Sequence, residues 1–138
     1  MHVIRTGPES QSPPAERFTG TVWIDPIASA APPSRLRVAR VHFSPGARTA
    51  WHRHPLGQIL HVMEGRGRVQ QRGHPVEDFQ AGDTIVTLPG EWHWHGAAPG
   101  IFMTHLAIQE ADDDCNDVYW GEHVTDDEYR LGSPSGQG

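Results

Sequence analysis

The feature that most constrains the fold is a succession of short β-type segments separated by turn residues. These segments alternate polar and apolar residues and are rich in β-branched and aromatic side chains, which is typical of strands. They are residues 21–25, 36–43, 49–54, 58–63, 67–72, 84–88, 92–97 and 101–110. Gly and Pro punctuate the chain between them at intervals of about 8–12 residues, as in β-sandwiches and small barrels. A βαβ fold would need helices of roughly 10–15 residues between the strands, and the gaps are too short for them. The sequence therefore predicts an all-β domain.

The turns and the ends of the chain give the expected organisation. We expect a turn at 44–47 (SPGA) and a hairpin turn at 64–67 (EGRG), where Gly occupies the demanding positions. Residues 1–16 are expected to form an N-terminal loop, residues 17–130 a single domain, and residues 131–138 a disordered tail. Only the stretch at about 117–130 has helical periodicity, so a short helical or irregular segment is expected there.

Composition excludes several classes of function. The formal net charge is −6 and no basic cluster stands out, so nucleic-acid binding is not expected, because it depends largely on neutralising phosphates. All eleven basic residues are Arg, which rules out a Schiff-base lysine and a P-loop. Acidic residues gather late in the chain and are expected to form a solvated surface segment. They are Glu110, Asp112, Asp113, Asp114, Asp117, Glu122, Asp126, Asp127 and Glu128.

The expected location is the cytoplasm. The single cysteine, Cys115, has no partner for an intramolecular disulfide. Residues 1–20 lack the apolar core of a signal peptide. No stretch reaches the roughly 18 consecutive apolar residues of a membrane span, so no membrane partner is expected.

Histidine is unusually frequent, with ten in 138 residues, and its spacing indicates a metal site. His52 and His54 lie two apart in a predicted strand and therefore point to the same face. Gln58 follows after the Pro55-Leu56-Gly57 turn and can face the same cavity. His93 joins them if strands 49–54 and 92–97 are neighbours. Three imidazoles and one amide oxygen suit Mn, Fe, Co, Ni or Zn.

A second group of polar residues is expected near this site. Met103, His105, Ala107 and Gln109 share one face of a strand, so His105 and Gln109 lie near the metal if that face is turned inward. His95 shares a face with His93, either as a fifth ligand or as a residue that lines the pocket. The indoles of Trp51, Trp92 and Trp94 alternate with the histidines and are expected to point away from the metal, into packing or a subunit interface. Four other histidines, His42, His61, His74 and His123, are expected to serve the surface or packing.

The spacing of glycines, histidines and position 58 resembles the two motifs of the cupin family. The first runs from Gly46 through His52-x-His54 to Gly65, and the second from Gly82 through Pro89-Gly90 to His93. This resemblance implies a jelly-roll β-barrel with a metal inside its mouth. The family usually has Glu where this chain has Gln58. A neutral Gln leaves the ion its full charge, so we expect a stronger Lewis acid and weaker binding, and Gln58→Glu is expected to tighten binding.

A finer resemblance extends over nearly the whole chain. Segments 17–26, 43–58, 89–99, 103–110 and 122–130 resemble the bacterial cupin hydroxynitrile lyases. That resemblance implies a manganese ion held by His52, His54, Gln58 and His93. It also implies that His105 is the general base, that Gln109 lies close to the substrate, and that Ala39 and Val41 line the apolar part of the pocket. The candidate catalytic residues are thus His105, Gln109 and His95, and the expected partner is a small hydroxyl-bearing substrate.

Other functions remain open at this point. An iron dioxygenase is disfavoured by the neutral Gln58, and a retro-aldol enzyme would use the same geometry. A non-enzymatic cupin that binds a metal or small molecule is the alternative from a different class. The family resemblance also implies a homodimer or homotetramer.

Overall fold

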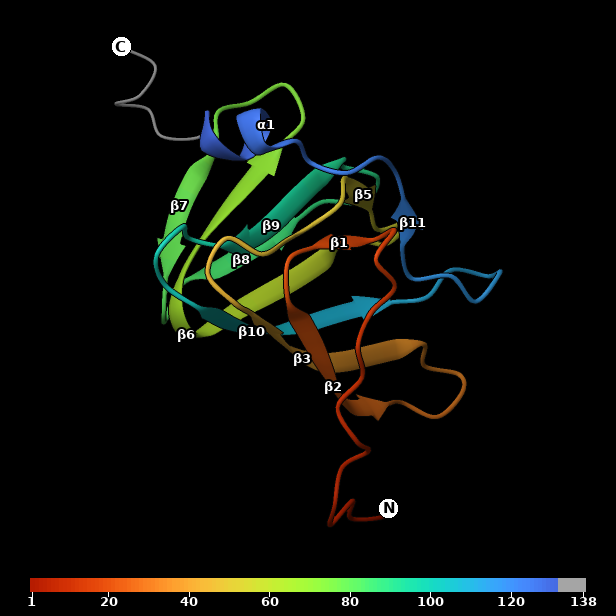
Figure 1. Cartoon of the computed structure of the whole chain (residues 1–138). Helices are drawn as coiled ribbons and strands as arrows, with labels where there is room; N and C mark the ends of the chain where they lie inside the picture. Colours follow the sequence, from red (N-terminus) through yellow and green to blue (C-terminus); the bar gives the residue numbers. More distant parts are fainter. Residues whose placement is uncertain (132–138) are drawn as a thin grey trace.

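The structure, a computed structural model, describes residues 1–131 and consists of two facing antiparallel sheets that share one long strand. The shared strand is β6 (Gln58–Gln71). The first sheet has the order β2-β3-β10-β6-β8. Its other members are β2 (Val22–Ser29), β3 (Leu36–Phe43), β8 (Thr84–Thr87) and β10 (Met103–Glu110). Figure 1 shows β2, β3 and β10 of this sheet on the lower side of the molecule.

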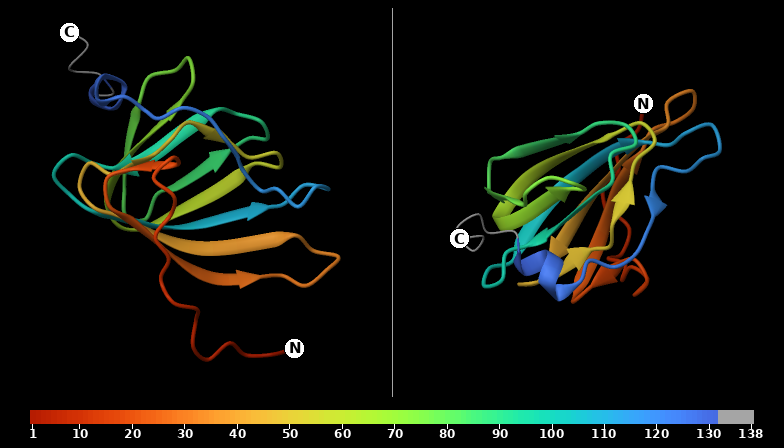
Figure 2. Two further views of the ribbon diagram at one scale, coloured as in Figure 1. Left: turned by 45° about the vertical axis from the view of Figure 1, so that its right-hand side comes forward. Right: turned by 90° about the horizontal axis from the view of Figure 1, so that it is seen from above.

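The second sheet surrounds the other half of β6 and consists of shorter strands. They are β1 (Phe18–Thr19), β4 (Arg48–Thr49), β5 (His52–Arg53), β7 (Glu77–Gln80), β9 (His93–Ala97) and β11 (Tyr119–Trp120). In this sheet β9 pairs with β6, β4 and β5, and β11 pairs with β5. Figure 2 shows the two sheets facing each other and joined along β6. The predicted all-β fold is confirmed as a nearly closed antiparallel barrel.

The expected hairpin turn at 64–67 is wrong, because β6 continues through these residues. The two glycines there serve a bend, in which the strand leaves the first sheet and enters the second. Gly65 has φ +79°, and a Cβ at this position would lie 1.8 Å from the carbonyl oxygen of Phe102. Composition alone does not separate such a bend from a hairpin, since both need residues without a side chain.

The main core lies between the two sheets, where alternate side chains of each strand point inward. It contains Val22, Val41, Phe43, Ala47, Leu60, Val62, Phe79, Ala97, Met103 and Ala107. A second cluster lies on the outer face of the second sheet and contains Trp51, Val76, Trp94, Val124 and Tyr129. The barrel wall near β9 is therefore packed on both sides, which restricts the positions of its side chains.

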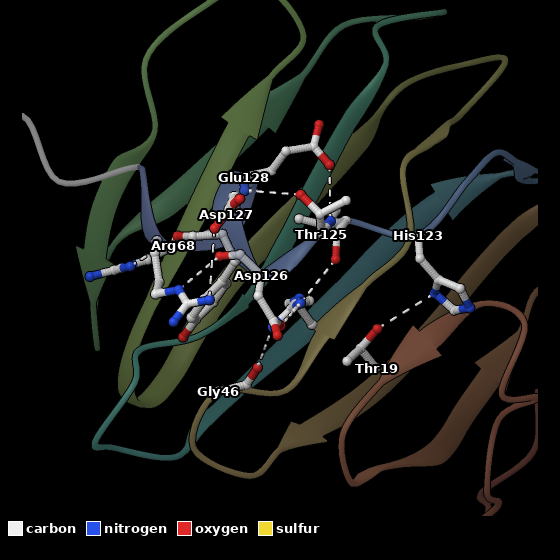
Figure 3. A network of polar contacts seen from close by, with 12 residues as sticks. Thr19, Gly46, Arg68, His123, Thr125, Asp126, Asp127 and Glu128 are labelled. Carbon is white, nitrogen blue, oxygen red and sulfur yellow. Dashed lines mark hydrogen bonds and ion pairs between the residues drawn. The ribbon is translucent and has the colours of Figure 1, made fainter. Parts of the chain in front are cut away.

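A short C-terminal helix, α1 (Asp126–Arg130), covers this second cluster. Thr125 and Glu128 form a capping box, in which each side chain bonds to the other residue's backbone N–H. The buried Arg48 guanidinium donates to the Val124 carbonyl and to Asp126, and Arg68 donates to the Tyr129 carbonyl (Figure 3). The helix is thus attached to β4 and β6 by charge-assisted hydrogen bonds.

The ends of the chain are described only in part. Gln11 bridges to Ile24 on the edge strand β2, so the N-terminal segment runs beside the first sheet (Figure 1). The expected irregular stretch at 117–130 contains the strand β11 as well as α1. Apart from Leu131, the predicted tail at 131–138 lies outside the described residues. The proposed domain limits remain a prediction. Among residues 1–131, no helix has the length and apolar character needed to cross a membrane.

Substitution of Gly65 by Ala tests whether the bend in β6 depends on the missing side chain. Gly65→Ala should destabilise the fold by about 1–3 kcal/mol more than Gly73→Ala, since its Cβ would overlap a backbone carbonyl. Gly73 is a matched control: it has φ +84° with nothing within 4 Å, so its variant carries only backbone strain of about 1–2 kcal/mol. Urea denaturation of both variants measures the difference. Equal losses of stability in the two variants would show that the overlap with the Phe102 carbonyl does not limit this position.

Candidate metal centre and active site

Two turns and one strand pairing assemble the site. Strand β5 pairs with β9 so that His52 lies directly opposite His93. The carbonyl of His54 accepts hydrogen bonds from the Gly57 and Gly90 amides, at 3.2 and 2.9 Å. The turn that leads to Gln58 and the turn that leads to β9 are thereby joined at one point. The condition set by the sequence, that segments 49–54 and 92–97 are neighbours, is met, and the four expected ligands lie at one end of the barrel.

The three histidines of this group are deeply buried and adjacent. His52, His54 and His93 expose only 2%, 3% and 2% of their surface. Their ring centroids are 5.0 Å apart for His52 and His54, 4.2 Å for His52 and His93, and 5.4 Å for His54 and His93. Buried imidazoles normally have their polar atoms satisfied, so the partners of each ring nitrogen decide what this cluster can do.

Each of these histidines uses Nδ1 to contact a backbone carbonyl. The acceptors are the carbonyls of Ala50 for His52, Asp117 for His54 and Glu91 for His93, at 2.9, 2.7 and 3.0 Å. A carbonyl only accepts hydrogen bonds, so in a neutral ring the hydrogen is on Nδ1 and Nε2 has a free lone pair. This arrangement is the one by which proteins orient metal-ligating histidines. The Nε2 atoms of His54 and His93 are buried without a partner.

Gln58 completes the donor set with an oxygen. Its Nε2 donates to Gln109 Oε1 at 3.1 Å, while its buried Oε1 has no hydrogen-bond partner. An unpaired buried oxygen costs about 1–3 kcal/mol, so a cation that accepts its lone pair would offset this cost. The residues present therefore fit a divalent ion held by three imidazole nitrogens and one amide oxygen.

His95 and His105 form a second pair of imidazoles beside this cluster. His105 Nε2 lies 3.2 Å from His95 Nδ1, and one of the two must donate to the other. One nitrogen each of His52, His93 and His95 lie within 4.8 Å of one another, a group that contains His95 and not the expected ligand His54. His95 is therefore also close enough to be a ligand. Its Nε2 is buried and unpartnered. The choice between ligand and lining residue depends on which of the paired nitrogens bears the hydrogen.

Burial keeps all five histidines neutral. Desolvation is the main cause that lowers the pKa of each ring below its usual value, to about 4 for His93 and about 3 for His105. The pKa values of His52, His54 and His95 are lowered for the same reason, and neighbouring imidazoles lower those of His52 and His95 further. Neutral imidazoles have the lone pairs that metal ligation and proton acceptance require.

A cavity of about 210 Å³ adjoins this cluster inside the barrel. Its apolar wall includes the predicted pocket residues Ala39 and Val41, and the candidate catalytic residues His95, His105 and Gln109 also line it. Sequence reasoning missed other wall residues, which are Phe18, Ile24, Phe43, Val118 and Trp120. The indole of Trp120 packs against the His52 ring, with centroids 4.8 Å apart. The alternation of Val118 and Trp120 was the only available signal for their common face.

Residues expected to face away from this histidine cluster do so. Trp51 and Trp94 belong to the second cluster, and Trp92 packs against it. His61 is turned outward and contacts Thr84. The expectation of a wholly solvated acidic segment is wrong in part, because Asp117 is only 18% exposed and contacts both Gln109 and Arg37.

Comparison with known proteins identifies the family of this chain. Residues 39–102 match the family described as a cupin domain. The sequence is 53% identical over 131 residues to (R)-mandelonitrile lyase of Granulicella tundricola, an alignment that covers 94% of this chain and 99% of that protein. The chain belongs to the cupin family. A relative that is named as a lyase supports an enzymatic function for this cupin.

Solved structures show the same fold. A cupin-like protein from Thermotoga maritima is 35% identical, with a TM-score of 0.83 over 97% of this chain and 98% of that chain. The polyketide cyclase RemF from Streptomyces resistomycificus matches with a TM-score of 0.69 and 20% identity, over 94% of this chain and 90% of that one. At that identity the likeness shows the fold alone.

The buried histidines should make stability depend on pH in the acidic range. Because the folded-state pKa values are lowered, the unfolded chain binds more protons below about pH 6.5. Stability should be full above that pH and fall toward pH 4, by up to about 1.4 kcal/mol per pH unit for each such histidine. Thermal denaturation with a chelator present measures this dependence. A midpoint that stays constant from pH 7 to pH 4.5 would contradict it.

Proposed function

We propose that this cupin is a metal-dependent lyase that cleaves a carbon–carbon bond in a small hydroxyl-bearing substrate. The substrate that we infer is a cyanohydrin, which would give an aldehyde and cyanide. The observation that carries this proposal is the set of buried, unpartnered donor atoms at His54, His93 and Gln58 beside a cavity lined by His105. The 53% identity to a protein named (R)-mandelonitrile lyase supports the choice of reaction.

The residues that would hold the ion are His52, His54, Gln58 and His93. A divalent ion bound there would supply Lewis acidity toward the substrate oxygen. Manganese is the ion that we propose, since the mixed nitrogen and oxygen donor set accepts it and the resemblance to the lyases implies it. The neutral Gln58 adds no negative charge at the centre.

His105 is positioned to exchange a proton with the substrate. We infer that its Nε2, which otherwise pairs with His95 Nδ1, accepts the hydroxyl proton. The bond between the hydroxyl-bearing carbon and the nitrile carbon then breaks, its electron pair leaves with cyanide, and the carbonyl forms. His105 returns the proton to cyanide, so the imidazole ends in its initial state. Its low pKa favours this return and disfavours the first transfer to the same extent.

The apolar wall suits a substrate with a hydrophobic body. Ala39, Val41, Phe43 and Trp120 line one cavity with His105, so an aromatic ring can be buried there while the hydroxyl faces the polar end. The cavity is too small for a macromolecule, and the proposed partner is therefore a small molecule. The homodimer or homotetramer stays a prediction, to be measured by light scattering.

Cleavage of mandelonitrile by the manganese-loaded protein tests the proposal. His105→Ala should lower kcat/KM by about 10²–10⁴-fold, the usual contribution of a general base, while the metal content is retained. His61→Ala is the matched control, because His61 is turned outward onto Thr84, and it should leave cleavage unchanged. Bound metal without cleavage would remove the proposed reaction. Absence of metal after reconstitution would remove the metal site.

A further inference from the structure

A chain of hydrogen bonds leads from Gln58 to the loop between β10 and β11. Gln58 Nε2 donates to Gln109 Oε1 at 3.1 Å, and Gln109 Nε2 donates to Asp117 Oδ2 at 2.9 Å. The other carboxylate oxygen of Asp117 lies 3.2 Å from Arg37 NH1. Both oxygens of Asp117 are therefore engaged, and the side chain is 18% exposed.

The direction of these bonds is set at the carboxylate. An ionised carboxylate only accepts hydrogen bonds, so Gln109 must turn its NH₂ group toward Asp117. Its oxygen then faces Gln58, which must present its own NH₂ group. An amide has its oxygen opposite its nitrogen, and Gln58 Oε1 is consequently directed away from Gln109. This is the oxygen that is buried without a partner at the proposed metal site.

Asp117 also contacts a second proposed ligand. Its backbone carbonyl accepts the hydrogen bond from His54 Nδ1 at 2.7 Å. One residue of this loop thus fixes the tautomer of His54 through its backbone and the orientation of Gln58 through its side chain. Neither contact requires Asp117 to touch the ion.

We propose that Asp117 is a positioning residue that selects a neutral glutamine, with its oxygen inward, at position 58. The inference rests on the proposed metal site. Gln109 connects Asp117 to Gln58, because its Nε2 donates to Asp117 and its Oε1 accepts from Gln58. Arg37 pairs with Asp117, so that the negative charge lies on the loop and not on the ligand at position 58.

The same series of hydrogen bonds opposes a glutamate at position 58. A carboxylate there would meet Gln109 Oε1, and two acceptors would face each other. If Gln109 turned over to donate to that glutamate, its oxygen would face the Asp117 carboxylate instead. The tighter binding expected from the added charge of Gln58→Glu should therefore be opposed as long as the side chain at position 117 is only an acceptor.

Substitution of Asp117 by Asn should reverse the donor-to-acceptor direction of the hydrogen bonds between positions 117, 109 and 58. Arg37 would still donate to the side-chain oxygen of the introduced asparagine, which leaves the asparagine NH₂ group to donate to Gln109. Gln109 would then turn its own NH₂ group toward position 58. That arrangement disfavours Gln58 with its oxygen inward and satisfies a glutamate at the same position. The effect of Asp117→Asn should thus have opposite signs in the two backgrounds.

Titration calorimetry with Mn²⁺ on the full chain tests this reversal. Asp117→Asn should weaken binding about 10–100-fold, the usual effect of losing a group that orients a ligand. In the Gln58→Glu background, the same substitution should instead tighten binding. Asp113→Asn is the matched control, since it removes one negative charge from the same loop at a residue that is 91% exposed and paired with Arg35. It should leave the dissociation constant near that of the wild type.

The thermal midpoint of each metal-free variant provides a second measurement. The double variant should be more stable than the sum of the two single effects predicts, which a merely structural role of Asp117 would not produce. Weakening of Mn²⁺ binding by Asp117→Asn in both backgrounds would overturn the inference and leave the proposed function intact. A wild-type protein that binds no Mn²⁺ would remove the proposed metal site and this inference with it.

Discussion

The candidate site depends on the antiparallel pairing of β5 with β9, which sets His52 opposite His93. Both strands are short, so a few backbone hydrogen bonds would not by themselves prevent a shift in register. A shift by one residue would turn every side chain to the opposite face. It would bring the indoles of Trp51 and Trp94 into the cavity and expose the imidazoles. These indoles are buried in the second cluster on the outer face, so packing outside the barrel fixes the histidines inside it.

The site holds its donor atoms at a cost to the fold. Several imidazoles and one amide are removed from water, and three of the proposed ligand atoms have no protein partner. The hydrogen bonds from each Nδ1 to a backbone carbonyl recover part of this cost and fix the rings in place. The free-energy cost that is not recovered is the expected consequence of a preformed binding site. A ligand that binds only the folded protein would return this free energy as stability.

The sequence was sufficient for the parts of this site that follow strand periodicity. His52 and His54 lie two residues apart, and Met103 through Gln109 alternate along one strand, so their common faces could be predicted. The sequence was insufficient where tertiary context decides. The glycines at 64–67 have turn composition, yet they serve a bend inside β6. Asp117 lies in an acidic run that resembles a solvated surface, and only the folded chain brings it to Gln109 and Arg37.

The contact between Asp117 and Gln109 separates two properties that a ligand usually combines. A glutamate ligand would orient itself by its charge and would bring that charge to the ion. Here the charge remains on Asp117, which is paired with Arg37 and accepts a hydrogen bond from the uncharged amide of Gln109. An amide transmits the direction of hydrogen bonding without transmitting charge. The fold can therefore orient the oxygen of Gln58 without placing a negative charge on the ligand itself, so a divalent ion bound there would be neutralised less than by a glutamate ligand.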